Sequence, residues 1–152
     1  MVSAPPVIRN AVAADIPALR EIFRRASLSN DGDRDTLLKN PDALEFSAAS
    51  ANEERTRVAV IEGRAVGFAT VVGEGGTLEL DDLFVEPERM RTGIGRALVL
   101  DAVTCARRLG GRRLEVTANP HALGFYDALG FEFDHQVETR FGPAPRMFLD
   151  IL

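Results

Sequence analysis

The stretch LFVEPERMRTGIGRAL, residues 83–98, decides how this chain folds. An apolar run ends at Val85, Pro87 marks a turn, and a loop of arginines and glycines leads into a helical pattern. Such a loop leaves backbone N–H groups without partners, and the start of a helix adds partial positive charge. Gly93 and Gly95 lack a Cβ, so an anionic group can approach the backbone closely. The stretch therefore predicts a site for phosphate or pyrophosphate, with three arginines adding positive charge.

Two common kinds of phosphate-binding loop do not fit this stretch. A P-loop requires a lysine and a hydroxyl residue after its last glycine, and both are missing here. A dinucleotide-binding fingerprint follows its strand directly and requires a third glycine, where Leu98 stands. The spacing of Gly93 and Gly95 alone is also typical of an ordinary glycine turn, so later segments are needed to decide.

Two later segments, LEVTANPHA (residues 114–122) and FYDALGF (residues 125–131), complete the pattern. The first reads as a strand that ends in an Asn-x-x-Ala turn, and the second as a short helix that carries Phe-Tyr and closes with Leu-Gly-Phe. Together with the loop they resemble the GCN5-related N-acetyltransferase (GNAT) family, in which a Gln/Arg-x-x-Gly-x-Gly/Ala loop grips the pyrophosphate of acetyl-CoA. Met90 stands where that loop usually has Gln or Arg, and Arg91 replaces a common glycine, so the chain departs from the family pattern at these two positions.

The resemblance covers residues 7–152 and implies a single domain, residues 1–152. The implied fold is a mixed α/β (α+β) structure, the GNAT-like acyl-CoA N-acyltransferase fold, with a central, mostly antiparallel sheet flanked by helices. Periodicity alone predicts only a mixed α/β chain. Asp15 is expected to cap a helix that carries Pro17 in its first turn and breaks at residues 29–33. The other expected helices are 34–40, 42–49, 94–109 and 122–129, and the expected strands are 7–12, 57–62, 65–72, 77–85, 112–118, 131–137 and 146–151.

The resemblance also implies which residues hold the coenzyme. Backbone groups of Phe84 and Val85 would pair with the pantetheine arm as an added strand, and an N–H near Val85 would stabilise the oxyanion. Asn119 would contact the coenzyme arm, or would form the turn before Pro120. The expected acetyl-CoA contacts are Phe84, Val85, Met90, Arg91, Thr92, Gly93, Ile94, Gly95, Arg96, Asn119 and Tyr126.

Acetylation of an amine requires a base, because a lysine-like amine has a pKa of about 10.4 and its neutral form lies roughly 4–5 kcal/mol uphill at pH 7. The strand over 77–85 carries three candidates, Glu79, Asp81 and Asp82. Alternation places Glu79 and Asp81 on one face and Asp82 on the other. Glu79 is similar by position to the base of histone-acetylating members, and the two aspartates are similar to an acidic pair in polyamine-acetylating members. The alternative is that these carboxylates line the solvent side of the strand. Glu115 matches a proposed base of ribosomal-protein-acetylating members, although a paired surface carboxylate is favoured there.

Tyr126 is the only tyrosine of the chain, and the resemblance implies that it is the general acid toward the coenzyme thiolate. A phenol has a pKa of about 10 and a thiol of about 8.5, so stabilisation of the thiolate by a hydrogen bond is equally open. A third interpretation is a half-buried tyrosine bonded to backbone. Cys105 falls in the apolar stripe of the central helix and is expected in the core. His121 and His135 lack the spacing of metal ligands, so no metal is expected.

The composition restricts the partners of the chain. A net charge of −5 argues against nucleic acid, and no apolar run is long enough to cross a membrane. A single cysteine and an N-terminus without the features of a secretory signal favour a cytoplasmic location. We expect direct acetyl transfer to a primary amine of a small molecule, a lysine side chain or an N-terminus, and the acidic strand favours a cationic acceptor. The alternatives are a coenzyme-A-binding sensor without turnover and an unrelated phosphate-binding module. A homodimer, common in the family, is left open.

Overall fold

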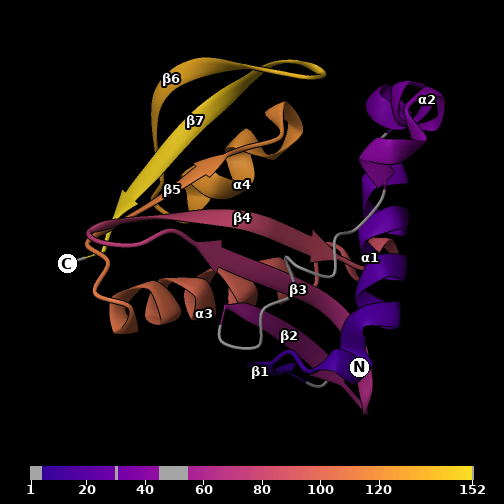
Figure 1. Ribbon diagram of the computed structural model, residues 1–152, viewed down its shortest axis with the longest axis horizontal. Coiled ribbons are helices and arrows are strands. Elements are labelled where there is room, and N and C mark those ends of the chain that lie inside the picture. Colours follow the sequence, from indigo (N-terminus) through magenta and orange to yellow (C-terminus); the bar gives the residue numbers. More distant parts are fainter. Residues whose placement is uncertain (1–4, 30, 45–54, 152) are drawn as a thin grey trace. The chain divides into compact units, whose positions relative to one another are not determined.

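The computed structural model describes residues 5–29, 31–44 and 55–151 (Figure 1). Its helices are α1 (Ile16–Leu28), α2 (Asp31–Lys39), α3 (Ile94–Arg108) and α4 (Leu123–Ala128), with short 3₁₀ helices η1 (Ala13–Asp15), η2 (Pro41–Leu44), η4 (Pro87–Arg89) and η5 (Pro120–Ala122). Its strands are β1 (Val7–Asn10), β2 (Thr56–Ile61), β3 (Arg64–Val72), β4 (Thr77–Val85), β5 (Arg113–Thr117), β6 (Glu132–Thr139) and β7 (Gly142–Asp150). The order of the main helices and strands is the predicted one.

The strands form a seven-stranded sheet in the order β1-β2-β3-β4-β5-β7-β6. β4 and β5 are parallel, whereas β1–β2, β2–β3, β5–β7 and β6–β7 are antiparallel pairs. The prediction of a mixed α/β fold with a mostly antiparallel sheet is therefore confirmed. The predicted strand over 77–85 is found with the same bounds as β4. The helix predicted over 42–49 begins as η2, and residues 45–49 lie outside the described residues.

The prediction was wrong about the last hairpin, which is longer than expected. The strands expected over 131–137 and 146–151 left residues 138–145, with Pro143 and Pro145, outside the sheet. In the structure both prolines lie in β7, where they pair with Glu138 and Gln136 of β6. A tight turn makes this pairing available, because Gly142 adopts a φ of 112° and the Thr139 hydroxyl donates to the Gly142 carbonyl at 2.7 Å.

The prediction that the Asp15 side chain caps α1 was also wrong. Arg9 of β1 donates to both Asp15 carboxylate oxygens, at 2.8 and 2.9 Å, and the Val12 N–H donates to Oδ2 at 2.8 Å. The Asp15 carboxylate is thus bound to Arg9 of β1 and to Val12, which precedes η1, rather than to α1. Helix α1 follows η1 directly, with Pro17 in its first turn as predicted.

The chain divides into two compact units, and the first comprises Met1–Thr70 and Asp82–Ala102. Its core joins the apolar stripe of α1 to side chains of β2 and β3. A Cβ on Gly67 would lie 2.9 Å from the Phe84 carbonyl oxygen and 3.1 Å from Leu98 Cδ1. Glycine at position 67 therefore lets β3 approach both the end of β4 and the first turns of α3. The buried members of the core are Ala11, Leu19, Ile22, Val58 and Phe68.

The second unit comprises Val71–Asp81 and Val103–Leu152. In it α4 lies beside β5 and β7 (Figure 1). Leu78, Leu114 and Met147 are buried on one face of its sheet. Residues next to them in sequence, Glu79 and Arg146 among them, lie on the other face and are half-buried. This polar face holds Glu79 and Glu115, two of the carboxylates that the sequence singled out.

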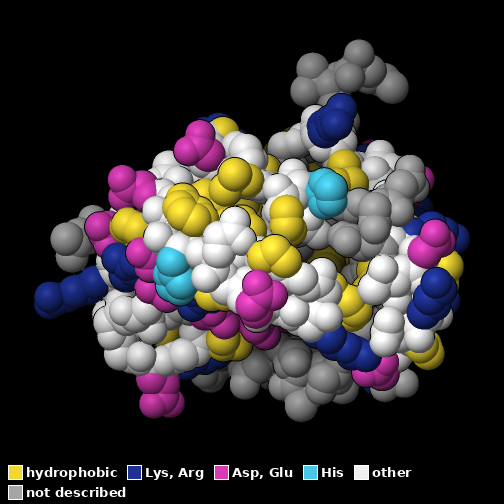
Figure 2. Space-filling model, turned by 90° about the horizontal axis from the view of Figure 1, so that it is seen from above, with side chains coloured by type: hydrophobic (Ala, Val, Ile, Leu, Met, Phe, Trp, Pro, Cys, Tyr) yellow, Lys and Arg dark blue, Asp and Glu magenta, His cyan; other side chains and the backbone are white. Residues whose placement is uncertain are grey.

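The surface of the second unit includes exposed hydrophobic side chains. Leu123, Phe133 and Phe141 are among the large hydrophobic residues that remain exposed. Figure 2 shows hydrophobic side chains gathered between the two histidines, with acidic side chains close by. Strand β6 is the last strand of the sheet, and residues 132–136 are exposed along it.

Candidate functional site

The predicted phosphate-binding loop, in the first unit, bends through two left-handed residues. Arg91 has a φ of 65° and Gly93 a φ of 91°. A left-handed conformation at a residue other than glycine costs about 1–2 kcal/mol. Arg91 thus adopts a conformation typical of the glycine that it replaces in the family pattern. Backbone of this kind aims N–H groups into a concavity that suits anions.

Helix α3 begins directly after this loop. The Ala97 N–H donates to the Gly93 carbonyl at 3.0 Å, so the N–H groups of Gly93, Ile94, Gly95 and Arg96 precede the first turn's hydrogen bond. An added Cβ on Gly93 would meet no atom within 4 Å, which leaves the approach to its backbone open. The hydroxyl of Thr92 donates to the Arg89 carbonyl and closes the loop on itself. These residues fit a pyrophosphate, because they combine an open approach, unsatisfied donors and nearby arginines.

The end of β4 leads into the loop and is anchored within the first unit. The Phe84 ring packs edge-on against Phe23 of α1, with centroids 4.8 Å apart, and lies 5.6 Å from Phe68 of β3. The next buried residue, Glu86, is 3% exposed, and its N–H donates to the Val66 carbonyl at 2.8 Å. Phe84 and Val85 themselves are half-buried. The backbone that was predicted to bind the pantetheine arm is therefore firmly positioned.

Tyr126, in the second unit, is a buried side chain of α4. It is 6% exposed and packs edge-on against Phe125 and Phe131, at centroid distances of 5.1 and 5.3 Å. Burial raises the pKa of its phenol far above the ordinary value of 10. The hydroxyl therefore stays protonated at any physiological pH, which makes it a hydrogen-bond donor rather than a proton source.

Asn119 forms the turn at the end of β5. Its Oδ1 accepts a hydrogen bond from the His121 N–H at 2.9 Å and so caps η5. The sequence left two roles open for Asn119, formation of this turn and contact with the coenzyme, and the structure shows the first. The role of Asn119 toward the coenzyme remains a prediction.

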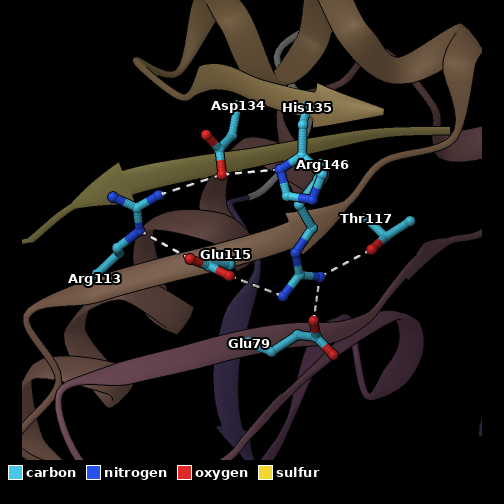
Figure 3. A network of polar contacts seen from close by, with 7 residues as sticks. All are labelled: Glu79, Arg113, Glu115, Thr117, Asp134, His135 and Arg146. Atoms are coloured by element: carbon cyan, nitrogen blue, oxygen red, sulfur yellow. Dashed lines mark hydrogen bonds and ion pairs between the residues drawn. The ribbon is translucent and has the colours of Figure 1, made fainter. Parts of the chain in front are cut away.

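Glu79 of β4 is engaged in a network of charged side chains on the polar face of the second unit (Figure 3). Arg146 of β7 forms an ion pair with Glu79 and a second with Glu115 of β5, at 3.0 Å from Nη2 to Oε1. Arg146 Nη1 also donates to the Thr117 hydroxyl at 2.8 Å. Sequence reasoning placed Arg146 at the start of a strand and missed this role, because the sheet order that brings β7 beside β5 is not visible in the sequence.

The network continues toward β6. Arg113 Nε donates to Glu115 Oε2 at 2.9 Å, and Arg113 Nη2 lies 3.9 Å from Asp134 Oδ2. Asp134 in turn contacts His135 Nδ1 at 3.0 Å. Hydrogen bonds from Arg113 and Arg146 outweigh burial and lower the pKa of Glu115. The expectation that Glu115 is a paired carboxylate is confirmed.

Asp81 differs from its neighbour Glu79. Partial burial, and then the charge of Glu79, raise the pKa of the Asp81 carboxyl. The influence of Glu79 agrees with the predicted placement of both side chains on one face of β4. Asp82, the third candidate, is half-buried and belongs to the first unit. The pKa of Asp81 is thus raised, whereas that of Glu115 is lowered.

No group of three or more His, Cys, Asp or Glu side chains could hold a metal ion within the ranges 5–29, 31–44 and 55–151. In the same ranges no helix is long and apolar enough to cross a membrane. Cys105 is buried, as predicted.

Comparisons with known proteins match most of the chain. A model of the acetyltransferase (GNAT) family matches residues 16–131. A rice protein (Oryza sativa subsp. japonica) named serotonin N-acetyltransferase 2, chloroplastic, is 32% identical over 129 residues, which cover 84% of this chain and 62% of the rice protein. The chain therefore spans less than two thirds of the length of this relative.

Solved structures share the fold along the whole chain. A GCN5-related N-acetyltransferase from Rhodopseudomonas palustris superposes with a TM-score of 0.81 at 21% identity, covering 99% of this chain and 98% of that one. The PaiA N-acetyltransferase from Thermoplasma acidophilum, in complex with coenzyme A, gives a TM-score of 0.77 at 17% identity, covering 97% and 99%. Because both sequence identities are low, the structural similarity establishes a shared fold and nothing more.

Proposed function

The chain belongs to the GNAT acetyltransferase family, and from this premise we propose that it is an N-acetyltransferase that moves the acetyl group of acetyl-CoA directly to a primary amine. The observation that carries the proposal is the loop before α3, where left-handed Arg91 and Gly93 precede the unsatisfied N–H groups of a helix start. Acetyl-CoA supplies the acetyl group as a thioester. Buried Cys105 is unsuited to carry an acetyl intermediate, which supports direct transfer.

Coenzyme binding is assigned mainly to backbone groups of the first unit. The segment from Met90 to Arg96 binds the pyrophosphate through its N–H groups, and the arginines add charge. Phe84 and Val85 pair with the pantetheine arm as an additional strand. Asn119 is a further candidate for a coenzyme contact.

Tyr126 stabilises the thiolate of CoA as it leaves. Because burial raises the pKa of this phenol, complete proton transfer to a thiolate is strongly uphill. Donation of a hydrogen bond costs no such proton transfer and still stabilises the charge that develops on sulfur. Tyr126 therefore acts as a donor, and the thiolate takes its final proton from the reacting amine.

The acceptor is a cationic primary amine in this proposal. Glu79, Asp81 and Asp82 lie on one strand of a chain with a net charge of −5, and acidic groups attract an ammonium group. The rice relative is named for serotonin, which is a primary alkylamine and is protonated at neutral pH. We therefore favour alkylamines, polyamines and aminoglycoside-like or lysine-bearing acceptors over anionic amino acids. The single buried cysteine suits a reducing compartment such as the cytoplasm.

The test is a transfer assay with the full chain, acetyl-CoA and a panel of amines. Release of the coenzyme thiol and mass spectrometry of the amine report transfer. Acetylation of at least one amine, lost in Gly93→Asp, supports the proposal. Binding of CoA without transfer to any amine would point to the sensor alternative. Equal competition by CoA, NAD and ATP would contradict a coenzyme-A site.

A further inference from the structure

Glu79 and Glu115 are neighbours across two parallel strands. They face each other in register between β4 and β5. Adjacent strands lie about 4.8 Å apart, so two carboxylates in such positions repel each other unless a cation lies between them. Arg146 supplies that cation, since its guanidinium contacts both carboxylates at once (Figure 3).

Arg146 is well suited to remain charged and fixed in place. Its side chain is 19% exposed, and hydrogen bonds to both glutamates outweigh the effect of burial and raise its pKa. Thr117 faces Arg146 in register on β5 and accepts a third hydrogen bond. Two nitrogens of the guanidinium thus hold three partners.

Asp81 stands outside this arrangement. It lies two residues from Glu79 on the same face of β4, and among the described residues it takes part in no ion pair that competes for its carboxylate. Its side chain is only partly buried and still reaches solvent, so a proton accepted there can pass on to water. The charged groups around this face are Glu79, Glu115, Arg113 and Arg146, followed by Asp134 and His135 at the β6 end.

We propose that Arg146 is a positioning residue that holds Glu79 and Glu115 as ion-pair partners and so leaves Asp81 as the carboxylate of this face that accepts the proton of the amine. This inference rests on the proposed function and selects one base among its candidates. The substrate ammonium gives its first proton to Asp81, which passes it to water. The nitrogen then forms the C–N bond, the C–S bond breaks, and the second nitrogen proton ends on the departing sulfur.

The first test needs no substrate and follows the carboxyl groups of the full chain by carbon NMR over a pH titration. In the native protein we expect Asp81 to titrate above, and Glu115 below, its ordinary range. In Arg146→Gln the two glutamates repel each other, so the proton affinity of Glu115 rises about tenfold or more. Arg146→Lys keeps part of the effect, and Arg112→Gln, at an exposed arginine of the same unit, leaves Glu115 unchanged. An unchanged Glu115 in Arg146→Gln would overturn the proposal.

The second test uses the best amine of the acceptor panel. Asp81→Asn should lower kcat at neutral pH by about a hundredfold or more, with a smaller change in KM. In the double variant Asp81→Asn with Arg146→Gln, the released Glu79 should restore about tenfold of that loss, because it becomes an available base. Full activity of Asp81→Asn, or no recovery in the double variant, would refute the assignment. Absence of transfer in the native protein would instead refute the proposed function and leave the titration result standing.

Discussion

Arg25 of α1 binds the buried carboxylate of Glu86, with Nε and Nη2 donating to Oε1 at 2.9 and 2.7 Å. The Glu86 side chain is 4% exposed and the Arg25 side chain 47% exposed, so the pair lies at the boundary of the first unit's interior. Glu86 stands between the end of β4 and η4, where the phosphate-binding loop begins. The ion pair therefore ties α1 to the start of that loop.

Removing Arg25 should destabilise the protein. In Arg25→Met the carboxylate of Glu86 stays buried and loses its charged partner, at an expected cost of about 1–3 kcal/mol in the free energy of unfolding. Urea denaturation measures this cost. Arg24→Met is the matched control, because Arg24 is an exposed neighbour on the same helix. Equal stability of the two variants would show that Glu86 does not depend on Arg25.

The charge of an aspartate at position 93 should abolish coenzyme binding. Gly93 adopts a left-handed φ and has open space where a Cβ would point, and Asp and Asn both tolerate this conformation. Gly93→Asn therefore keeps the fold and adds bulk without charge, whereas Gly93→Asp also repels phosphate. We expect the Kd for CoA to rise at least about tenfold more in Gly93→Asp than in Gly93→Asn. Gly95→Asp should weaken binding similarly.

Titration calorimetry with CoA measures these constants. A second control is Gly75→Asp, which places the same charge on an exposed left-handed glycine in the other unit. Acetyl-CoA should raise the melting temperature of the native protein and of Gly75→Asp, but not of Gly93→Asp. The assignment of the loop would fail if the native protein and Gly93→Asp bound CoA equally well.

Asp15 should make stability depend on acid pH. Hydrogen bonds from Arg9 are the largest cause that lowers the pKa of Asp15 in the folded state. The unfolded chain then binds the proton more tightly, so the stabilisation is present above the unfolded pKa of about 3.9 and is lost as pH falls through the folded pKa. Because Arg9 is 44% exposed, the effect is expected to be about 1 kcal/mol.

Denaturation at several pH values tests this assignment. The stability difference between the native protein and Asp15→Asn should be largest near neutral pH and should shrink below about pH 4. Asp35→Asn, at an exposed position of α2, should show no such convergence. A difference that stayed constant with pH would mean that Asp15 acts through packing rather than charge.

The sequence correctly predicted those elements whose bounds depend mainly on residues that are close together in the chain. β4 was found with its predicted bounds because apolar Leu78 and Leu80 alternate with polar side chains before a proline turn. The bent loop before α3 was predicted for a similar reason, since glycine spacing and a helix start adjoin in sequence. In these segments the local preferences and the final fold agree.

Contacts between distant segments could not be predicted in this way. Asp15 has the composition of a helix cap, yet Arg9 on β1 binds its carboxylate. Residues 138–145 were expected outside the sheet, yet pairing with β6 places Pro143 and Pro145 in a strand. Arg146 stands 67 positions after Glu79 in the chain, and only the sheet order β4-β5-β7 brings the two side chains together. Single-sequence patterns carry no information about such partners.

Loss of the Tyr126 hydroxyl should affect turnover more than binding. Tyr126→Phe keeps the ring packed against Phe125 and Phe131 and removes only the hydrogen-bond donor. We expect kcat to fall by roughly one to three orders of magnitude with little change in the KM for acetyl-CoA. Because burial raises the pKa of Tyr126, the pH–rate profile between about pH 6 and about pH 9 should keep its shape. An unchanged kcat, with chemistry shown to limit the rate, would reduce Tyr126 to a packing residue.

The carboxylates of β4 should make the protein discriminate between amines that differ by one carboxylate. Tryptamine and tryptophan share a ring and an ethylamine chain, and putrescine and ornithine share a diamine, but the second member of each pair adds a negative charge. Asp81 and its neighbours repel that charge, so kcat/KM should be at least about tenfold higher for the first member, equivalent to about 1.4 kcal/mol. Asp81→Asn should bring the kcat/KM values of the two amines in each pair closer together, while Arg112→Gln should leave their ratio unchanged. Steady-state kinetics on the four amines measures these ratios, and a preference for tryptophan or ornithine in the native protein would contradict a cationic acceptor.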